Sequence, residues 1–306
     1  VIVNQAADTK YNAGLATMTL TIIKANPVII FNDITKNYED PDFNLSAISS
    51  STGAFTYTVF NTEIGTLSDT TVSIIGAGAS IVTVNQAADS NYNSALATMT
   101  LTVNKSNQVI SFLDVTKAYG TGDFDLSATS SSSGAYSFTI TNNAVATVSA
   151  NTVSIVAVGS TIVMVNQAAD SNYNSGTATM TLTITKANPI ISFNDLNKDI
   201  TDPDFNLSPI SNSTGGFAFS ITDNNIATIN GSTVSILSAG ASLVTVNQAA
   251  DSNYNSGTAT MTLIVRMNPS VIFSNIIKTY GNPDFVVNAT SNSSGAMIYA
   301  VSDSSI

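Results

Sequence analysis

The sequence predicts an all-β protein, built as a tandem array of antiparallel β-sandwich domains with a period of about 81 residues. Three observations lead to this prediction. One peptide, VNQAADSNYNS, occurs at residues 84–94, 165–175 and 246–256, and a looser copy, VNQAADTKYNA, occupies residues 3–13. Apolar and polar residues alternate through most of each period, as in strands, and no stretch shows the periodicity of a helix. A unit of this length can bury a core of its own.

The period divides the chain into segments. The glutamine of the repeated peptide recurs every 81 residues, at Gln5, Gln86, Gln167 and Gln248. We expect three complete repeats of immunoglobulin-like size, at residues 25–105, 106–186 and 187–266, which we call the first, second and third bead. Residues 1–24 are expected to form the C-terminal part of a repeat, and residues 267–306 the N-terminal part of another. The chain therefore resembles a piece of a longer protein, and we expect any signal or anchor to lie outside it.

Composition excludes several classes of function. Charged residues make up 9% of the chain, against roughly 25% in an average globular protein. The net charge of −11 repels phosphate backbones, so we expect no nucleic-acid partner. The sequence contains no run of roughly 18 apolar residues, and we expect no membrane contact from this segment. Cysteine and histidine are absent, which removes the usual catalytic triads and the usual zinc ligands.

The strand pattern is clearest in two runs. Met99, Leu101 and Val103 alternate with threonines, which indicates a strand with one buried face. Residues 136–140 alternate in the same way. Turn signals at residues 118–123, 130–135, 141–144 and 170–175 separate these runs from the other predicted strands, which lie at residues 109–112, 124–128, 146–148, 153–156 and 161–165.

About seven short strands and no helix indicate an antiparallel sandwich of the immunoglobulin type. The tryptophan usual in true immunoglobulin domains is missing. We expect its central core position to be filled by an aromatic residue that recurs with the period, at Tyr57, Phe138, Phe219 and Tyr299.

Longer stretches resemble a known family. The segment NAVATVSANTVSIVAVGSTIVMV (residues 142–165) resembles the bacterial immunoglobulin-like domains of surface proteins. ITKNYEDPDFNLSA (residues 34–47) and DSNYNSALATMTLTV (residues 89–103) resemble the tandem repeats of giant bacterial cell-surface adhesins, among them the gliding-motility adhesins of the Bacteroidota. The resemblance covers every unit. It implies the fold and an extracellular location at the bacterial cell surface, and it identifies no ligand.

The position of the repeated peptide predicts a junction between beads. In a seven-strand sandwich the loop between strands F and G lies at the end where the domain's N-terminus enters, and the A–B loop lies at the opposite end. The DSNYNS loop of one bead should therefore face the A–B loop of the bead before it. The linkers are about four residues long, and Pro27, Pro189 and Pro269 stiffen them further.

Two interpretations of the junction residues remain open. In the first, the tyrosines of the loop plug the end of the sandwich, while its Asp and Asn side chains cap the backbone of their own turn. In the second, carboxylates from two beads hold Ca²⁺, which prefers oxygen ligands. The candidate ligands are Asp40 and Asp42 with Asp170 at one junction, and Asp123 with Asp251 at the next.

A lysine also recurs just before the A–B loop. We expect it to form a surface ion pair with a nearby aspartate. Its four copies are Lys36, Lys117, Lys198 and Lys278.

No unit departs from the others to build a site of its own, so we expect no enzyme and no resident cofactor. Three functions remain: the stalk of an adhesin, a structural surface layer or filament, and a passive spacer in a large secreted enzyme. A lattice would require exposed apolar patches, whereas the outward positions are mostly Thr, Ser and Asn, which favours the stalk. The expected partners are neighbouring repeats and, through the wider protein, surface glycans or other cell-surface or substratum ligands.

Overall fold

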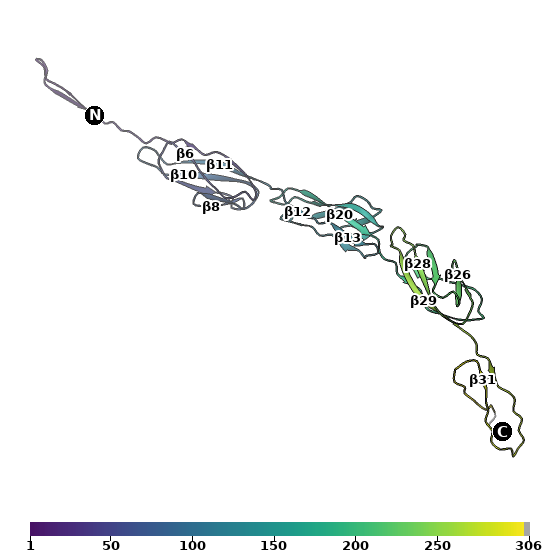
Figure 1. Ribbon diagram of the computed structural model, residues 1–306. Coiled ribbons are helices and arrows are strands. Elements are labelled where there is room, and N and C mark those ends of the chain that lie inside the picture. Colours follow the sequence, from purple (N-terminus) through teal and green to yellow (C-terminus); the bar gives the residue numbers. More distant parts are fainter. Residues whose placement is uncertain (303–306) are drawn as a thin grey trace. The chain divides into compact units, whose positions relative to one another are not determined.

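The computed structural model describes residues 1–302, and every element within them is a strand. Figure 1 shows the strands as arrows along the chain. The residues form two compact units. The boundary between the units passes through the second bead. The first unit comprises Val1–Val115, Asp123–Ser154 and Thr161–Leu182, and the second comprises Thr116–Gly122, Ile155–Ser160 and Thr183–Ile306.

The first bead lies within the first unit. Its strands form a four-stranded sheet in the order β4-β11-β10-β7, a three-stranded sheet in the order β5-β9-β8, and the pair β3-β6. The strands are β3 (Ile29–Ile30), β4 (Ile34–Asn37), β5 (Phe43–Asn44), β6 (Ile48–Ser49), β7 (Phe55–Val59), β8 (Gly65–Ser68), β9 (Thr71–Ile74), β10 (Gly78–Gln86) and β11 (Ala95–Asn104).

One strand pair differs from the predicted antiparallel pattern. The hairpin β10–β11 pairs antiparallel from Gly78 opposite Val103 to Gln86 opposite Ala95. The short strand β4, in contrast, pairs parallel with β11, with Ile34 opposite Leu101. The chain passes from the β3-β6 pair to the edge of the larger sheet before it has made a turn, so it runs in the same direction as the last strand. Alternation along one strand carries no information about the direction of its neighbour, which is why the sequence prediction missed this pair.

The core of the first bead lies between its sheets. Met99, Leu101 and Val103 are buried, as the alternation predicted. They pack with buried valines from β9 and β10. Each such side chain contributes roughly 1.5–3 kcal/mol through burial of apolar surface. Tyr57 packs against this core at its margin: its ring is half-buried and lies 5.7 Å from the ring of Phe31.

The third bead, in the second unit, repeats this plan. Its sheets have the orders β22-β29-β28-β25, β23-β27-β26 and β21-β24, and β22 again pairs parallel with β29. Leu263 and Val265 are buried in its core. The strands are β21 (Ile191–Ser192), β22 (Leu196–Asp199), β23 (Phe205–Asn206), β24 (Ile210–Ser211), β25 (Phe217–Ile221), β26 (Ala227–Asn230), β27 (Thr233–Ile236), β28 (Gly240–Gln248) and β29 (Gly257–Arg266).

The second bead has the corresponding sheets β13-β20-β19-β16, β14-β18-β17 and β12-β15. Equivalent strands begin 81 residues apart, as at Gly78, Gly159 and Gly240. The predicted all-β tandem array of immunoglobulin-like sandwiches is therefore confirmed, while the segment limits at residues 25, 106 and 187 stay predictions. The strands of the second bead are β12 (Ile110–Ser111), β13 (Val115–Ala118), β14 (Phe124–Asp125), β15 (Thr129–Ser130), β16 (Tyr136–Ile140), β17 (Ala146–Ser149), β18 (Thr152–Ile155), β19 (Gly159–Gln167) and β20 (Gly176–Thr185).

The two end segments contain short strand pairs. Residues 1–24 form the hairpin of β1 (Ile2–Gln5) and β2 (Gly14–Thr17), and the C-terminal segment holds β30 (Val271–Ile272) paired with β31 (Thr290–Ser291). Across residues 1–302, no helix has the length and apolar character needed to cross a membrane.

Candidate functional site

The repeated peptide begins with a buried glutamine. Gln86, the last residue of β10, is 2% exposed. Its Nε2 atom donates hydrogen bonds to the carbonyl oxygens of Ser51 and Gly53, each at 3.0 Å. Its Oε1 atom accepts one from the Ser49 hydroxyl at 2.6 Å. Because a buried polar group is stable only when it is hydrogen-bonded, the glutamine holds the Ser-rich loop before β7 against the end of β10.

The aspartate of the peptide holds the same loop from the other side. Asp89 Oδ2 accepts hydrogen bonds from the Ser51 hydroxyl and from the backbone N–H and hydroxyl of Thr52, at 2.9–3.0 Å. Its Oδ1 atom accepts the backbone N–H groups of Asn91 and Tyr92, both at 2.8 Å. The Thr52 N–H, together with these other donors, favours the charged form and holds the pKa of Asp89 well below its usual range. The predicted cap of the turn is confirmed for the aspartate. The asparagine side chains of the loop bind the linker and the preceding bead instead.

A glycine permits the loop to lie this close. A Cβ atom on Gly53 would stand 1.8 Å from the carbonyl oxygen of Ala87, inside the repeated peptide. The same contact recurs at Gly134 and Gly215, each with the alanine carbonyl of its own bead. The glycine of the Ser-rich loop therefore packs directly against the backbone of the repeated peptide, with no room for a side chain.

The second part of the peptide fixes the linker that enters the bead. Asn174 donates its backbone N–H to the Ser106 carbonyl at 2.9 Å, and its side-chain Nδ2 to Asn107 Oδ1 at 2.8 Å. Lys105 Nζ donates to the Asp170 carbonyl at 2.5 Å. Asn93 and Asn255 make the corresponding side-chain bonds to Asn26 and Asn188. Each linker is thus hydrogen-bonded to the loop of the bead that follows it.

The first junction, between the first and second beads, lies within the first unit. Asn172 Oδ1 accepts the backbone N–H of Ala77, which precedes β10, at 3.0 Å. The Tyr173 ring meets the Tyr38 ring edge to face, with centroids 5.3 Å apart. The Tyr173 hydroxyl donates a hydrogen bond to Glu39. The prediction that the F–G loop of one bead faces the A–B loop of the bead before it is confirmed here.

The second junction, within the second unit, uses the same side chains. Asn253 Oδ1 accepts the backbone N–H of Val158 at 3.1 Å. The rings of Tyr254 and Tyr119 also meet edge to face, at 5.4 Å. Lys186 Nζ donates to the Asp251 carbonyl at 2.6 Å. The two junctions are built from one sequence pattern.

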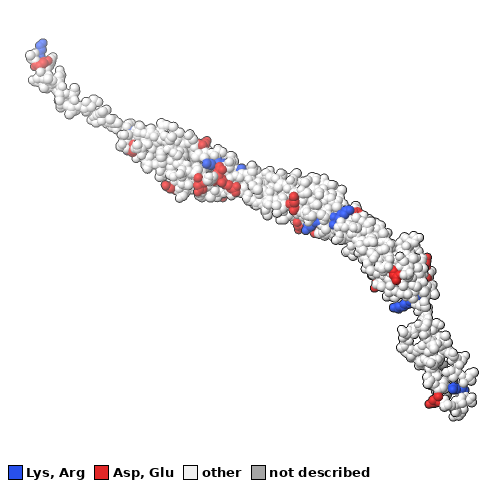
Figure 2. All heavy atoms as spheres, viewed as in Figure 1, with Lys and Arg blue, Asp and Glu red and all other residues white. Residues whose placement is uncertain are grey.

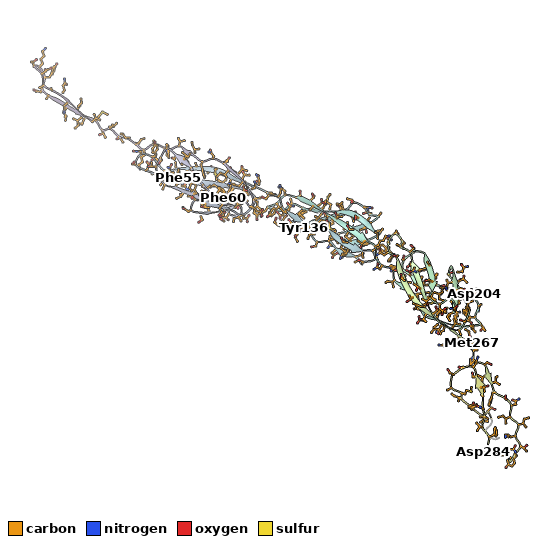
Figure 3. The ribbon with its side chains drawn as sticks, in the orientation of Figure 1. Phe55, Phe60, Tyr136, Asp204, Met267 and Asp284 are labelled. Carbon is orange, nitrogen blue, oxygen red and sulfur yellow. The ribbon has the colours of Figure 1, made fainter. Side chains whose placement is uncertain are left out.

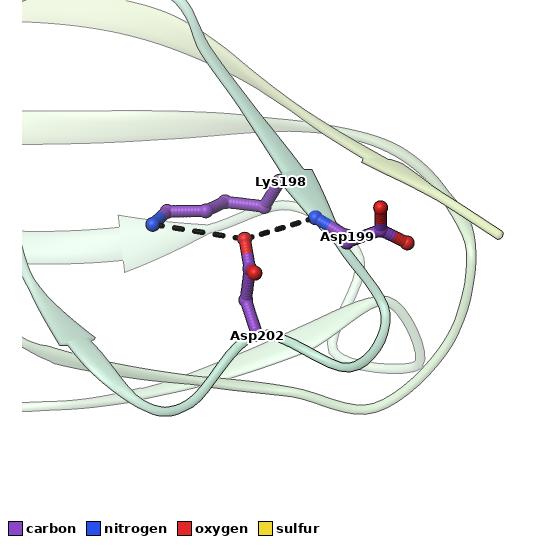
Figure 4. Close-up of polar contacts among 3 residues, drawn as sticks. All are labelled: Lys198, Asp199 and Asp202. Carbon is purple, nitrogen blue, oxygen red and sulfur yellow. Dashed lines mark hydrogen bonds and ion pairs between the residues drawn. The ribbon is translucent and has the colours of Figure 1, made fainter. Parts of the chain in front are cut away.

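The candidate calcium ligands have hydrogen-bond partners within their own beads. Asp40 Oδ2 accepts the backbone N–H of Asn37 at 2.8 Å. Its counterpart Asp202 accepts the N–H of Asp199 at 3.0 Å and lies 3.8 Å from Lys198 Nζ (Figure 4).

Asp42 Oδ2 accepts the Ser73 hydroxyl at 2.8 Å. Asp204, labelled in Figure 3, does the same with Ser235.

The remaining candidates are Asp170, Asp251 and Asp123, of which the first two share one arrangement. Asp170 and Asp251 occupy the position of Asp89 and hold the Ser-rich loops of their beads, and Asp123 is exposed in its turn. Within the described residues, no three acidic side chains gather closely enough to hold a metal ion. Calcium at the junctions stays a prediction. A thermal melt of the chain with added Ca²⁺ and with a chelator tests it, and identical melts would contradict it.

The recurring lysine has a second kind of partner besides the expected aspartate. Lys36, Lys198 and Lys278 place their Nζ atoms 5.1, 4.7 and 5.2 Å from the ring centroids of Phe43, Phe205 and Phe285. Cations over aromatic faces attract through the quadrupole of the ring. The signal in the sequence is the constant spacing of seven residues between the lysine and the phenylalanine. The expected ion pair with an aspartate is confirmed at Lys198.

The face shown in Figure 2 is mostly uncharged, and the surface is less polar than the outward positions predicted. Phe60, labelled in Figure 3, is 85% exposed. Val28, Ile30 and Ile48 are also exposed, and Ile30 pairs with Ile48 across β3 and β6. The first bead therefore carries apolar side chains on its outside.

Comparison with known proteins gives distant structural likenesses. No protein-family model and no curated protein matches the chain. Among solved structures, Drosophila N-cadherin EC1-4 is 14% identical, with 87% of this chain and 82% of that chain covered and a TM-score of 0.26. An I-band fragment of titin is 10% identical, with coverage of 80% and 100% and a TM-score of 0.30.

The surface layer protein SbsC, domains 1–6, is 14% identical, with 85% of this chain and 43% of that chain covered and a TM-score of 0.29. Likeness at this level says nothing about what the chain binds.

Proposed function

We propose that this chain belongs to the non-catalytic repeat stalk of a very large bacterial cell-surface adhesin. Its beads would project a binding tip, or multiply weak contacts through their number. The observation that supports this role is the repeated junction: Asn172 and Tyr173 contact the preceding bead as Asn253 and Tyr254 do. Junctions that repeat with the domain suit an array that must hold its beads in order.

The family resemblance of residues 34–47, 89–103 and 142–165 supports an extracellular location at the cell surface. Gliding motility is the most specific role that we propose for such an adhesin. The partners would be surface glycans or substratum ligands, bound through the wider protein, and the neighbouring repeats themselves.

An antibody raised against a single bead tests this role on living cells of the source organism. Surface threads that travel along the cell would support a motile adhesin. Label that is fixed over the whole envelope would favour a surface layer or a static stalk. Label found only in the medium would contradict the adhesin and favour the spacer of a secreted enzyme.

The alternative of a surface layer or filament is favoured by one specific observation. Phe60, Ile30 and Ile48 expose apolar surface on the first bead, and lateral assembly would bury such surface. Light scattering of the 306-residue chain over a range of concentrations measures such assembly. Growth in mass that Phe60→Ser abolishes would support the lattice, and a constant monomer mass would contradict it.

A further inference from the structure

The turn after β4 holds a residue in an unusual backbone conformation. Glu39 has a φ of 72°, in the left-handed region. Gly120 and Gly281, which occupy the same place in their own repeats, have φ values of 78° and 90°. Within residues 1–302, Asp69 and Ala150 are the other residues besides glycine with a positive φ. A side chain in this conformation carries a steric cost that glycine avoids, and such residues are often retained for a function.

The carboxylate of Glu39 contacts the following bead. It accepts a hydrogen bond from the Tyr173 hydroxyl, beside the edge-to-face contact of the Tyr173 and Tyr38 rings. Tyr173 is 6% exposed. The hydrogen bond to Glu39 also raises the pKa of the Tyr173 hydroxyl, since the phenol must keep the proton that it donates. The side chain at the left-handed position therefore has a partner across the junction.

The second junction is a natural control for this contact. Tyr254 meets Tyr119 in the same ring geometry, and Asn253 and Lys186 repeat their bonds. Gly120, however, has no side chain to reach the Tyr254 hydroxyl, and Tyr254 is only half-buried. The two junctions thus share their ring, amide and lysine contacts and differ in the carboxylate.

The next position in the series differs again. The third bead carries Ile200 and Thr201 where the first carries Tyr38 and Glu39. This pair offers neither an aromatic ring nor a carboxylate to a following tyrosine.

We propose that the two residues that follow β4 set how strongly each bead is bound to the next. At the first junction the hydrogen bond from Tyr173 to Glu39, which we call the clasp, makes the junction open less often than the second. Together, Glu39 and Tyr38 form a binding site for the Asn-Tyr loop of the following repeat. This difference between junctions depends on the junction residues alone and not on what the array carries. Under load or bending, an array graded in this way opens at its glycine junctions before its glutamate junctions.

Amide-resolved hydrogen exchange on the 306-residue chain tests the clasp. The reporters are the amides of Ala77 and Val158, each of which donates to the junction asparagine of the following bead. Glu39→Gly, which copies the second junction, should lower the protection factor of Ala77 roughly three- to tenfold, the effect of one net hydrogen bond. The protection of Val158 should stay unchanged. The reciprocal Gly120→Glu should raise the protection of Val158.

Two further variants separate the clasp from effects within the bead. Tyr173→Phe removes the donor and leaves the turn untouched, so it should reproduce the loss at Ala77. Glu63→Gln removes the charge of the other glutamate in the chain and should leave Ala77 unchanged. Wild-type protection of Ala77 in both Glu39→Gly and Tyr173→Phe would overturn the proposal. Loss of protection throughout β10 and β11 in Glu39→Gly, with none in Tyr173→Phe, would also overturn it, because Glu39 would then act only inside its bead.

Discussion

The two halves of the repeated peptide have different contact partners. Its inner half, residues 86–89 in the first bead, turns back into its own bead, where Gln86 and Asp89 hold the Ser-rich loop. Its outer half, residues 91–93, binds the linker that enters the bead. In the second and third beads the equivalent residues also contact the preceding bead. The inner contacts are the same in the first and third beads, at Gln86 and Gln248. The outer contacts change with the neighbour, as Tyr173 and Tyr254 show.

This difference shows why one peptide recurs unchanged. The inner half makes its contacts within its own bead, whatever precedes that bead in the chain. The outer half holds the linker in each of the three beads, and its asparagine and tyrosine gain a second role where a preceding bead supplies the opposite surface. Variants that affect one half should therefore leave the other half intact.

Gly215→Ala should damage the inner half most. The added Cβ would stand 1.8 Å from the backbone carbonyl oxygen of Ala249, which cannot rotate away. We expect a loss of about 3 kcal/mol in the stability of the third bead, at the upper end of overpacking effects. Exchange of the β28 and β29 amides in the whole chain measures it. Gly216→Ala is the matched control, because a Cβ there meets nothing within 4 Å. Equal effects from both variants would contradict the fitted contact.

Gln248→Leu should come next. It leaves the carbonyl oxygens of Ser213 and Gly215 without their donor, at a cost of about 2 kcal/mol for the third bead. The same exchange measurement applies. Substitution of the exposed neighbour, Asn247→Thr, should stay within about 0.5 kcal/mol. If Gln248→Leu left the exchange of the β28 and β29 amides unchanged, the glutamine would not be needed to hold the loop.

The hydrogen bonds that the aspartate of the repeated peptide accepts should make each bead sensitive to acid. The backbone N–H of Thr214 and other donors hold the pKa of Asp251 well below its ordinary value of 3.8. A lowered pKa in the folded bead means that the charge stabilises it at neutral pH. That stability is lost as the pH falls below the ordinary value towards the folded one. Acid unfolding followed by circular dichroism should show this loss of stability. Asp251→Asn should make stability depend less on pH and should lower it at pH 7. If the stability of the wild-type and Asp251→Asn chains fell in parallel with pH, the Asp251 charge would not have this stabilising role.

The smallest expected effect belongs to the outer half. Asn172→Ala removes the acceptor of the Ala77 amide and should speed its exchange roughly three- to tenfold. Asn91→Ala is the same change in the same loop, but within the described residues the Asn91 side chain has no hydrogen bond to a preceding bead. We expect it to leave the exchange of the first bead unchanged. A matching response to both variants would mean that the asparagine acts on its own loop and not at the junction.

Much of the fold followed from the sequence because the determining patterns are local. The 81-residue spacing of Gln86 and Gln167 defines the repeat, and the alternation of Met99, Leu101 and Val103 defines a buried face. The order of loops in a sandwich then placed Tyr173 opposite the turn that holds Tyr38. Strand β13 was missed, because Val115–Ala118 is short and includes a lysine, and its pairing comes from a neighbour far along the chain.

The tertiary structure decided which partner each side chain finds. The parallel pairing of β4 with β11, the burial of Gln86 and the meeting of Glu39 with Tyr173 all join residues that are dozens of positions apart. A repeat shows that such residues recur, but their contacts depend on how sheets and loops meet in space. The sequence by itself therefore determined the bead and the place of its junction. The folded chain determined the hydrogen bonds that hold the junction, because they form only after two beads have brought their backbones together.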